Sequence, residues 1–394
     1  MTKFKKSAVS LLSLFCAACL FTGTVFGDYS GKAGAGAGKD GTINKVSAPV
    51  ETDAEEFYDE NVVYKLPDTV SDDQEISLIV DMGTQSVLDS YNENVSGMTL
   101  SEYASSSDAR NISRRIATES AKYKAKLSGA GISYSVGETY DTIFSGFEIR
   151  VRAKDFAKVS GLLSDATVIV GEEYEPAAVS EVVTNEVDVY ETGIFDSSDS
   201  EYQGDGVVVA VLDTGLDYTH TAFSVDNFTT TNEAFTLQSV SGMVGNTVAA
   251  GYNPGLTGED VYVSKKVPYA YDYGAKDSAV FPLNSDHGTH VAGIIAGKDD
   301  VITGVAPNAQ LAIMKVFSDY SEGAKTSAIL AALNDCVKLG VDVINMSLGT
   351  SCGFSREVDE ENVNEIYDSI KAAGISLIAA ASNDYNPTFN SEKN

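Results

Sequence analysis

The sequence is poor in positive charge. Its 394 residues contain 27 lysines and arginines against 57 aspartates and glutamates, which gives a formal net charge of -30. So acidic a surface repels nucleic acid and anionic membranes, and neither is expected as a partner. The excess of acidic residues mostly confers solubility, although a cationic partner surface stays open.

The sequence also has few cysteines. Of the four, Cys16 and Cys19 lie in an apolar N-terminal segment, so that only Cys336 and Cys352 remain for a folded part. Two cysteines do not build a disulfide scaffold, and their spacing does not decide whether they pair.

Long hydrophobic runs are missing except at the N-terminus. Three lysines within the first six residues precede an apolar run over residues 8–26, which is the order of a secretory signal peptide. Cleavage is expected near Gly27. A retained membrane anchor is the alternative, since about 20 apolar residues can span a bilayer. We therefore predict a signal peptide over residues 1–27 and a secreted or cell-envelope protein with no other membrane contact.

Residues 28–71 contain little that could form a core. Residues 31–38 are rich in glycine, and residues 51–60 form an acidic, self-repelling run with few apolar side chains. We interpret 28–71 as a flexible linker.

Hydrophobic periodicity begins at residue 72 and continues to residue 176. The pattern predicts a strand at 75–80, a helix over 112–127 ended by Gly129, strands at 132–140 and 143–151, a helix at 153–163 and a strand at 167–170. This succession is typical of a small α+β ferredoxin-like domain. On the pattern alone, a generic α+β module is the favoured interpretation.

From Gly206 onward strands and helices alternate, which predicts an α/β domain. Residues 207–212 form a continuous apolar run, typical of a parallel strand covered on both faces. Asp213 follows directly, at the strand end where the ligand sites of open α/β sheets collect. A lone aspartate there could equally cap the turn that Thr214 and Gly215 predict.

The alternation continues to the end of the chain. Further strands are predicted at 309–317, 341–346 and 375–381, with amphipathic helices at 327–339 and around 363–370 between them. The carboxyl ends of these strands point toward one crevice, and the last strand leads to Ser382 and Asn383.

His287 stands at the predicted start of a helix rich in small residues. The partial positive charge of a helix N-terminus disfavours an imidazolium and so helps keep the ring ready to accept a proton. A buried carboxylate such as Asp213 would fix the tautomer of that ring. His290 and His220 are interpreted as structural, His290 through packing. A metal site at His287 and His290 is the alternative, but the glutamate of a His-Glu-x-x-His pattern is missing, so no metal ligand is predicted.

Five short motifs together resemble the subtilisin-like serine proteases of peptidase family S8. They are 213–215 (DTG), 287–293 (HGTHVAG), 304–309 (GVAPNA), 345–349 (NMSLG) and 381–383 (ASN). The sequences of residues 266–273 and 332–340 further resemble the cell-envelope proteinase and C5a-peptidase branch. The resemblance covers the chain from about Gly204 to its end.

The resemblance implies a fold for each part. Residues 177–394 would form a subtilisin-like catalytic domain, an α/β doubly wound parallel sheet that is incomplete at its C-terminus. Residues 72–176 would be an inhibitor I9-like propeptide of α+β ferredoxin-like fold, which lies product-like in the cleft.

The resemblance also implies roles for six residues. Asp213 would orient His287, the general base and then acid, and Asn383 would donate a hydrogen bond to the oxyanion. The backbone of Ser347, Leu348 and Gly349 would pair with the substrate as an added β-strand. No cofactor is certain, and calcium stays open.

Two departures from the family pattern are visible. Ser382 replaces the glycine usual before the oxyanion asparagine, which affects the local backbone. The long separation of Asp213 and His287 implies an inserted region around residues 225–280. Three tyrosines there could form a substrate wall or core, and core is favoured: Tyr269, Tyr271 and Tyr273.

The nucleophile of this chemistry is missing from the sequence. Residues 349–351 read Gly-Thr-Ser, but Ser351 precedes Asn383, whereas the family's serine follows that position at the head of another helix. We therefore expect the chain to be the N-terminal part of a secreted serine endopeptidase precursor, acting on protein or peptide substrates, and to be inactive alone. The alternative is an inactive short form that binds peptides or inhibits. Substrate specificity cannot be predicted.

Overall fold

The computed structural model describes residue 66 and residues 70–95, 97–176, 203–321, 323–349 and 357–380, the last without the side chains of 357–364. The predicted signal peptide, nearly all of the predicted linker, Ser351, Cys352, Ser382 and Asn383 lie outside these ranges. Residues 65–394 belong to one compact unit. No helix within the described ranges is long and apolar enough to cross a membrane.

The N-terminal part contains a four-stranded antiparallel sheet with strand order β2-β3-β1-β4. Its strands are β1 (Glu75–Asp81), β2 (Ser135–Tyr140), β3 (Gly146–Arg152) and β4 (Thr167–Val170). Its helices are α2 (Val87–Asn94), α3 (Leu100–Ala104), α4 (Ser107–Gly129) and α5 (Phe156–Leu162), the last preceded by a 3-10 turn at Ala153–Asp155. Apart from α2 and α3, the elements up to β4 follow one another as strand, helix, strand, strand, helix, strand.

This part differs from the sequence prediction in several details; for example, α4 begins at Ser107 and β3 at Gly146. Helices α2 and α3 were not predicted, although each begins with a capping box, Ser86 with Asp89 and Thr99 with Glu102. Strand β2 begins later than predicted because the N–H of Ile132 donates to the carbonyl oxygen of Leu127 at 3.1 Å and so closes the end of α4.

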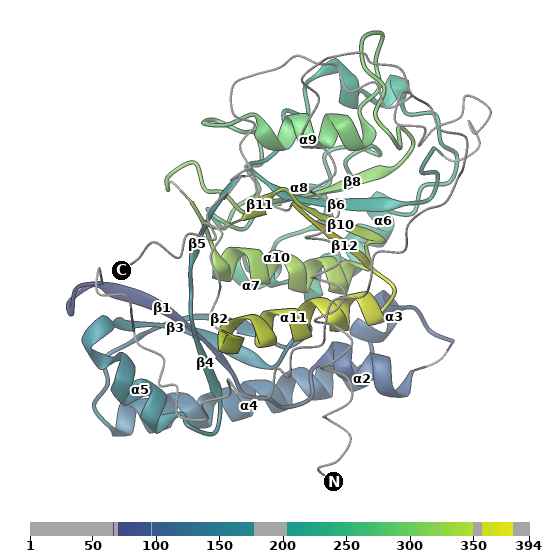
Figure 1. The fold of residues 1–394 in the computed structure, drawn as a ribbon. Helices are drawn as coiled ribbons and strands as arrows, with labels where there is room; N and C mark the ends of the chain where they lie inside the picture. The colour runs from purple at the N-terminus through teal and green to yellow at the C-terminus, as the bar shows by residue number, and fades with distance from the viewer. Residues whose placement is uncertain are drawn as a thin grey trace, which may run out of the picture. The chain divides into compact units, whose positions relative to one another are not determined.

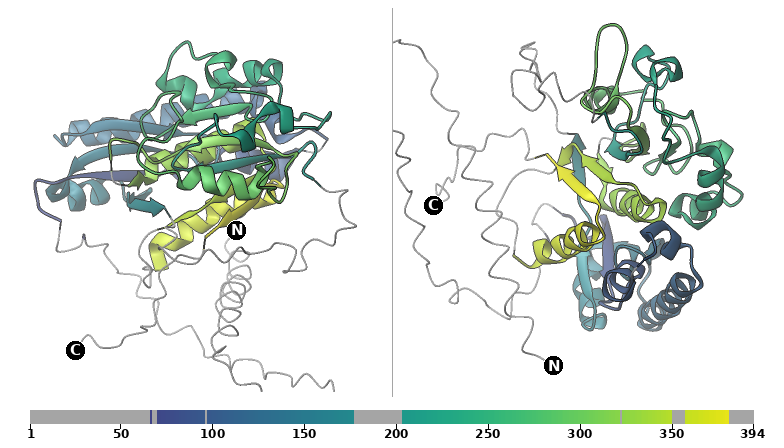
Figure 2. Two further views of the ribbon diagram at one scale, coloured as in Figure 1. Left: turned by 90° about the horizontal axis from the view of Figure 1, so that it is seen from above. Right: turned by 90° about the vertical axis from the view of Figure 1, so that its right-hand side faces the viewer.

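The C-terminal part contains a five-stranded sheet in which every pair of neighbours is parallel, in the order β12-β10-β6-β8-β7. Its strands are β6 (Val208–Asp213), β7 (Tyr269–Asp272), β8 (Gln310–Lys315), β10 (Val343–Met346) and β12 (Ser376–Ala379). The predicted α/β fold with a parallel sheet is confirmed. The outer strand β12 is the yellow arrow of Figure 2.

Helices cover both faces of the parallel sheet (Figure 1). Helix α9 (His287–Ala296) lies on one face, and α10 (Thr326–Leu339) and α11 (Glu357–Ala372) lie on the other. The side chains of β6 alternate between them: Val209 and Val211 pack in the cluster that contains Ala292 of α9, and the residues in between pack with α10. Because both faces are covered, the strand is a continuous apolar run.

The inserted region between β6 and α9 contributes to the core. It holds α6 (Leu237–Met243), α7 (Val248–Tyr252), α8 (Gly258–Val261) and strand β7. Tyr269, Tyr271 and Tyr273 are each at most 1% exposed, so the prediction that they are core is confirmed. The hydroxyl of Tyr273 donates to the buried carboxylate of Asp335 on α10 at 2.8 Å.

Helix α10 packs against both the parallel sheet and the N-terminal part, and nearly all of its residues are buried. One continuous apolar cluster joins its side chains to Ile79, Tyr140 and Phe144 of the N-terminal part. Polar contacts accompany this packing: the N–H of Thr142 donates to Asn334 Oδ1 at 3.2 Å, and Lys338 Nζ lies 3.0 Å from Asp141 Oδ1. The N-terminal part therefore covers a face of α10 that would otherwise be an exposed apolar surface.

Replacing Leu333 with alanine is predicted to destabilise the protein by about 2–5 kcal/mol, because this side chain is fully buried in the shared cluster and its loss leaves a cavity. Denaturant unfolding of the variant and the parent chain measures the difference. Val301→Ala is the control, since Val301 is 89% exposed and should change stability by less than about 0.5 kcal/mol. Equal effects of the two substitutions would contradict the shared core.

Candidate active site

Asp213 and His287 meet at the carboxyl end of β6. Asp213 is the last residue of that strand and is 1% exposed, and His287 is the first residue of α9. The Nδ1 atom of His287 lies 2.8 Å from Oδ1 of Asp213. The structure thus brings together two of the side chains that the sequence analysis selected.

Local packing forces the start of α9 against the turn that follows β6. Thr214 Oγ1 donates to the carbonyl of Ser285 and accepts the N–H of Gly288, both at 2.9 Å. A Cβ atom at Gly288 would lie 2.4 Å from the carbonyl oxygen of Gly215 and 3.0 Å from Cβ of Asp213. Only glycine permits so close an approach, and this approach is what places His287 beside Asp213.

The hydrogen bonds of Asp213 determine which ring nitrogen of His287 carries the proton. An ionised carboxylate only accepts hydrogen bonds, and Oδ1 of Asp213 already accepts the N–H of Thr214 at 2.7 Å. The ring must therefore hold its proton on Nδ1, so that a neutral His287 presents Nε2 as the proton-accepting atom. Oδ2 of Asp213 is buried and has no hydrogen-bond partner within the part of the chain that the structure describes.

The other two histidines lie apart from this pair. Nδ1 of His220 accepts the N–H of Ala222 at 3.1 Å, which is the structural role expected of it. The packing role predicted for His290 is wrong: its side chain is 70% exposed and faces Asp286 at 3.6 Å. His290 lies about one turn after His287 in α9, on the side of the helix that faces away from the sheet. Among the described residues, no three His, Cys, Asp or Glu side chains gather closely enough to hold a metal ion.

Ser347 to Gly349 lie along an edge where a third, three-stranded sheet forms, with strand order β11-β5-β9. Its strands are β5 (Glu173–Pro176), β9 (Ala324–Lys325) and β11 (Leu348–Gly349). The middle strand β5 runs antiparallel to both neighbours, with Pro176 opposite Leu348 and Tyr174 opposite Ala324. The predicted substrate-binding segment therefore pairs with the last described residues of the predicted propeptide.

Two features shape the space between β9 and β11 that β5 fills, which we call the groove. Asn345 Nδ2 donates to Ser347 Oγ at 3.0 Å, which ties the start of the edge to β10. On the other side, a Cβ atom at Gly323 would lie 3.0 Å from the carbonyl oxygen of Tyr174, so a larger residue there would be tightly packed against the backbone of β5. Asn383, the predicted oxyanion donor, lies outside the described residues.

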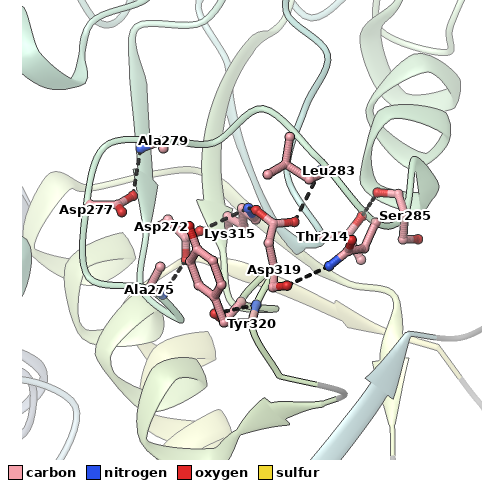
Figure 3. Close-up of polar contacts among 12 residues, drawn as sticks. Thr214, Asp272, Ala275, Asp277, Ala279, Leu283, Ser285, Lys315, Asp319 and Tyr320 are labelled. Atoms are coloured by element: carbon pink, nitrogen blue, oxygen red, sulfur yellow. Dashed lines mark hydrogen bonds and ion pairs between the residues drawn. The ribbon is translucent and has the colours of Figure 1, made fainter.

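Sequence reasoning missed one polar cluster near the pair. Lys315, the last residue of β8, is fully buried, and its ammonium contacts the carboxylates of Asp272 and Asp319 (Figure 3). Its signal in the sequence was a lysine directly after the apolar run 311–314, because a buried ammonium requires carboxylate partners.

The fold and the site define a class of α/β protein in which a buried carboxylate and a histidine meet at the carboxyl end of a parallel strand. Residues 204–394 match the model of the Subtilase family, peptidase S8. This part of the chain is therefore a domain of the subtilase family, a family of serine proteases, and the resemblance predicted from the motifs is confirmed.

Relatives agree with the predicted branch. The chain is 27% identical over 308 residues to a PII-type proteinase of Lacticaseibacillus paracasei, covering 72% of this chain and 14% of the relative. It is 30% identical over 285 residues to a PI-type proteinase of Lactococcus lactis subsp. cremoris, with 68% and 14% covered. It is 33% identical over 195 residues to a C5a peptidase of Streptococcus pyogenes, with 46% and 15% covered. The chain thus spans about a seventh of the length of these curated relatives.

Solved structures were also similar. Fervidolysin from Fervidobacterium pennivorans, described as a keratinolytic enzyme related to subtilisin, shares 19% identity at a TM-score of 0.46, covering 83% of this chain and 42% of the other. The epidermin leader peptide processing protease of Staphylococcus aureus shares 16% identity at a TM-score of 0.43, covering 79% and 61%.

Gly288→Ala is predicted to destabilise the protein by about 1–3 kcal/mol, because the added methyl group would push α9 away from the turn after β6. Gly293→Ala in the same helix is the matched control. A Cβ there meets only Ile302 Cδ1 at 3.7 Å, so alanine should be neutral or stabilise the helix by up to about 1 kcal/mol. Thermal unfolding measures both, and a stable Gly288→Ala variant would show that the approach is not tight.

Proposed function

We propose that this chain is the N-terminal part of a secreted subtilisin-like serine endopeptidase precursor that hydrolyses peptide bonds of protein or peptide substrates outside the cell or at the cell envelope. The observation that carries the proposal is the 2.8 Å contact between His287 Nδ1 and Asp213 Oδ1 in a subtilase-family domain. The relatives reported above are named as proteinases and peptidases, which supports the same class of reaction.

In this proposal His287 is the general base and then the general acid. Nε2 takes the proton of a serine hydroxyl as the oxygen attacks the scissile carbonyl, and later returns it to the leaving amine. Asp213 keeps the Nδ1 tautomer and stabilises the imidazolium that forms in between. Its burial strengthens this effect, because a charge interaction is screened less away from water.

The remaining parts of the machinery are assigned by family. Asn383 donates a hydrogen bond to the oxyanion, and loss of such a donor lowers kcat by about 10² to 10³. The nucleophilic serine is provided by residues that follow Asn394 in the complete protein, and Ser351 does not replace it. No cofactor is assigned to this step, and calcium stays open.

The groove between β9 and β11 binds the substrate backbone as an added strand. Ser347, Leu348 and Gly349 form one wall of it, and β5 occupies the place of the substrate. We therefore propose that residues 72–176 are the protein's own propeptide, bound in the cleft after the signal peptide (1–27) and the linker (28–71), and that the catalytic domain begins at 177.

An inactive short form that only captures peptides is the second candidate. The pairing of β5 on both sides favours this candidate, because the groove holds an extended strand by backbone pairing alone and no bond needs to be broken. The coding sequence after Asn394 separates the two: a further helix that begins with a Gly-Thr-Ser motif supports the protease, and an immediate stop codon supports the short form.

The protease is tested with a fluorophosphonate probe, which labels an activated serine. The 394-residue chain should remain unlabelled, whereas the chain extended by its continuation should be labelled and should hydrolyse casein after removal of the propeptide. In the extended protein, His287→Ala should lower kcat by about 10⁶ and Asp213→Ala by about 10⁴. Labelling of the 394-residue chain that disappears in Ser351→Ala would overturn the assignment of the nucleophile.

The propeptide assignment is tested by inhibition of the processed enzyme with separately prepared residues 72–176. Lys338→Ala should raise the inhibition constant about tenfold, because the carboxylate of Asp141 then loses a charge-assisted hydrogen bond. The value of kcat/KM for a small peptide should not change, since Lys338 lies in the last turn of α10, far from β9. Lys265→Ala is the control, because Lys265 contacts Phe228 of the catalytic part. An unaltered inhibition constant would contradict this docking.

A further inference from the structure

The segment that leads into His287 is fastened at both of its ends. We call residues 279–286 the strap. Near its start, the carbonyl oxygen of Val280 accepts the N–H of Leu216 at 2.9 Å, and near its end the carbonyl of Ser285 accepts Thr214 Oγ1 at 2.9 Å. Both contacts join the strap to the turn that follows β6.

The middle of the strap is fastened to a different loop. The N–H of Leu283 donates to Asp319 Oδ1 at 3.2 Å, and Asn284 Nδ2 donates to the carbonyl oxygen of Asp319 at 2.7 Å (Figure 3 labels Leu283 and Asp319). Asp319 follows β8, in the loop that continues to β9 (Ala324–Lys325), the edge that pairs with β5. A single residue therefore links the approach to His287 with the loop that carries one wall of the groove.

Asp319 is itself held by a buried ammonium. The Nζ atom of Lys315 contacts Asp319 Oδ2 and lies 3.0 Å from Asp272 Oδ2, while Asp272 Oδ1 accepts the N–H of Ala275 at 2.7 Å. In the sheet register Lys315 lies opposite both Asp213 of β6 and Asp272 of β7. The cluster thus sits in the same row as the carboxylate of the candidate active site.

The charge on Lys315 makes this attachment rigid. Burial alone would lower the pKa of its ammonium, but the hydrogen bonds and charges of Asp319 and Asp272 outweigh burial and hold the pKa above its ordinary value. If Asp319 moved away, a fully buried cation would lose one of its two carboxylates, which is strongly unfavourable. Asp319 is therefore a fixed point for the strap, unlike an exposed loop side chain.

We propose that Asp319, held in place by Lys315, is a positioning residue for His287: it anchors the strap and so keeps the imidazole in register with Asp213. The proposal rests on the function proposed above, because the exact placement of His287 matters only if His287 is the catalytic base. Its competitor is that two direct contacts hold the histidine without help from the strap: Thr214 Oγ1 accepts the N–H of Gly288, and Thr289 Oγ1 of α9 accepts the N–H of Asp217.

The test needs no turnover, so its outcome is independent of where the nucleophile lies. The 394-residue chain contains three histidines, which makes NMR of a histidine-labelled sample simple to assign by replacing His220 and His290 in turn. The measured quantity is the rate at which the Nδ1 proton of His287, hydrogen-bonded to Asp213, exchanges with water.

Asp319→Ala and Asn284→Ala should each speed that exchange about tenfold, the factor expected when one anchoring hydrogen bond of the strap is lost. The resonances of His220 and His290 should not move. Tyr320→Ala is the matched control, because Tyr320 is the next residue of the same loop and is 85% exposed, and its side chain makes no hydrogen bond within the described part of the chain. It should leave the exchange rate unchanged.

Asn284→Ala also protects the test against misfolding, because it removes one strap contact and leaves the buried ions untouched. Circular dichroism and the melting temperature verify that each variant is folded. An exchange rate that stays at the parent value in folded Asn284→Ala and Asp319→Ala would overturn the proposal, as would an equal acceleration in Tyr320→Ala.

In the extended, active protein the same proposal predicts a specific kinetic pattern. Asn284→Ala should lower kcat about tenfold with KM nearly unchanged, because a misplaced base affects the transition state more than substrate binding. A rise in KM at constant kcat would instead place Asp319 and Asn284 in substrate binding and would contradict the positioning role.

Discussion

The hydrogen bond between His287 Nδ1 and Asp213 Oδ1 is the interaction on which the candidate site depends. It exists because two backbone segments approach each other unusually closely, and Gly288 is the residue that permits the approach. The same contact sets the tautomer of the ring, so one geometric constraint fixes both the position of the histidine and the nitrogen on which it can accept a proton. Chemistry at this site is therefore a consequence of how tightly α9 packs on the turn after β6.

Buried charges connect the sheet to the loops at this end. Asp213, Lys315 and Asp272 lie in one row across β6, β8 and β7, and each is at most 1% exposed. A buried charge must be met by hydrogen bonds or by an opposite charge, and each of these three has such partners. These partners come from loops and turns, so satisfying the charges also fixes the loops. The carboxyl end of the sheet, where loops normally vary most, is thereby held by electrostatics as well as by packing.

Much of this arrangement could be predicted from the sequence, and the exceptions have physical reasons. The apolar run before Asp213 and the small residues after His287 carry local signals, because burial on both faces and close helix packing restrict the residue types directly. The ion cluster around Lys315 was missed because its partners Asp272 and Asp319 come from other segments, and only the fold decides which acids meet a given lysine. The exposure of His290 was predicted wrongly because helical spacing gives the angle between two side chains and not the face that the sheet covers.

Strand β5 is another feature that the sequence alone did not predict, and its pairing bears on how the groove recognises a peptide. Residues 173–176 form a run of only four residues, too short for its alternation to predict a strand from the sequence, and β9 and β11 pair with its backbone on both sides. An edge that imposes strand structure on so unremarkable a sequence recognises the backbone more than the side chains. Under the proposed function, such a groove would accept many sequences, and selectivity would come from the side-chain contacts around it. Tyr174 shows one such contact: it is mostly buried and packs against the shared apolar cluster, so the groove has an apolar wall at this position of the bound strand.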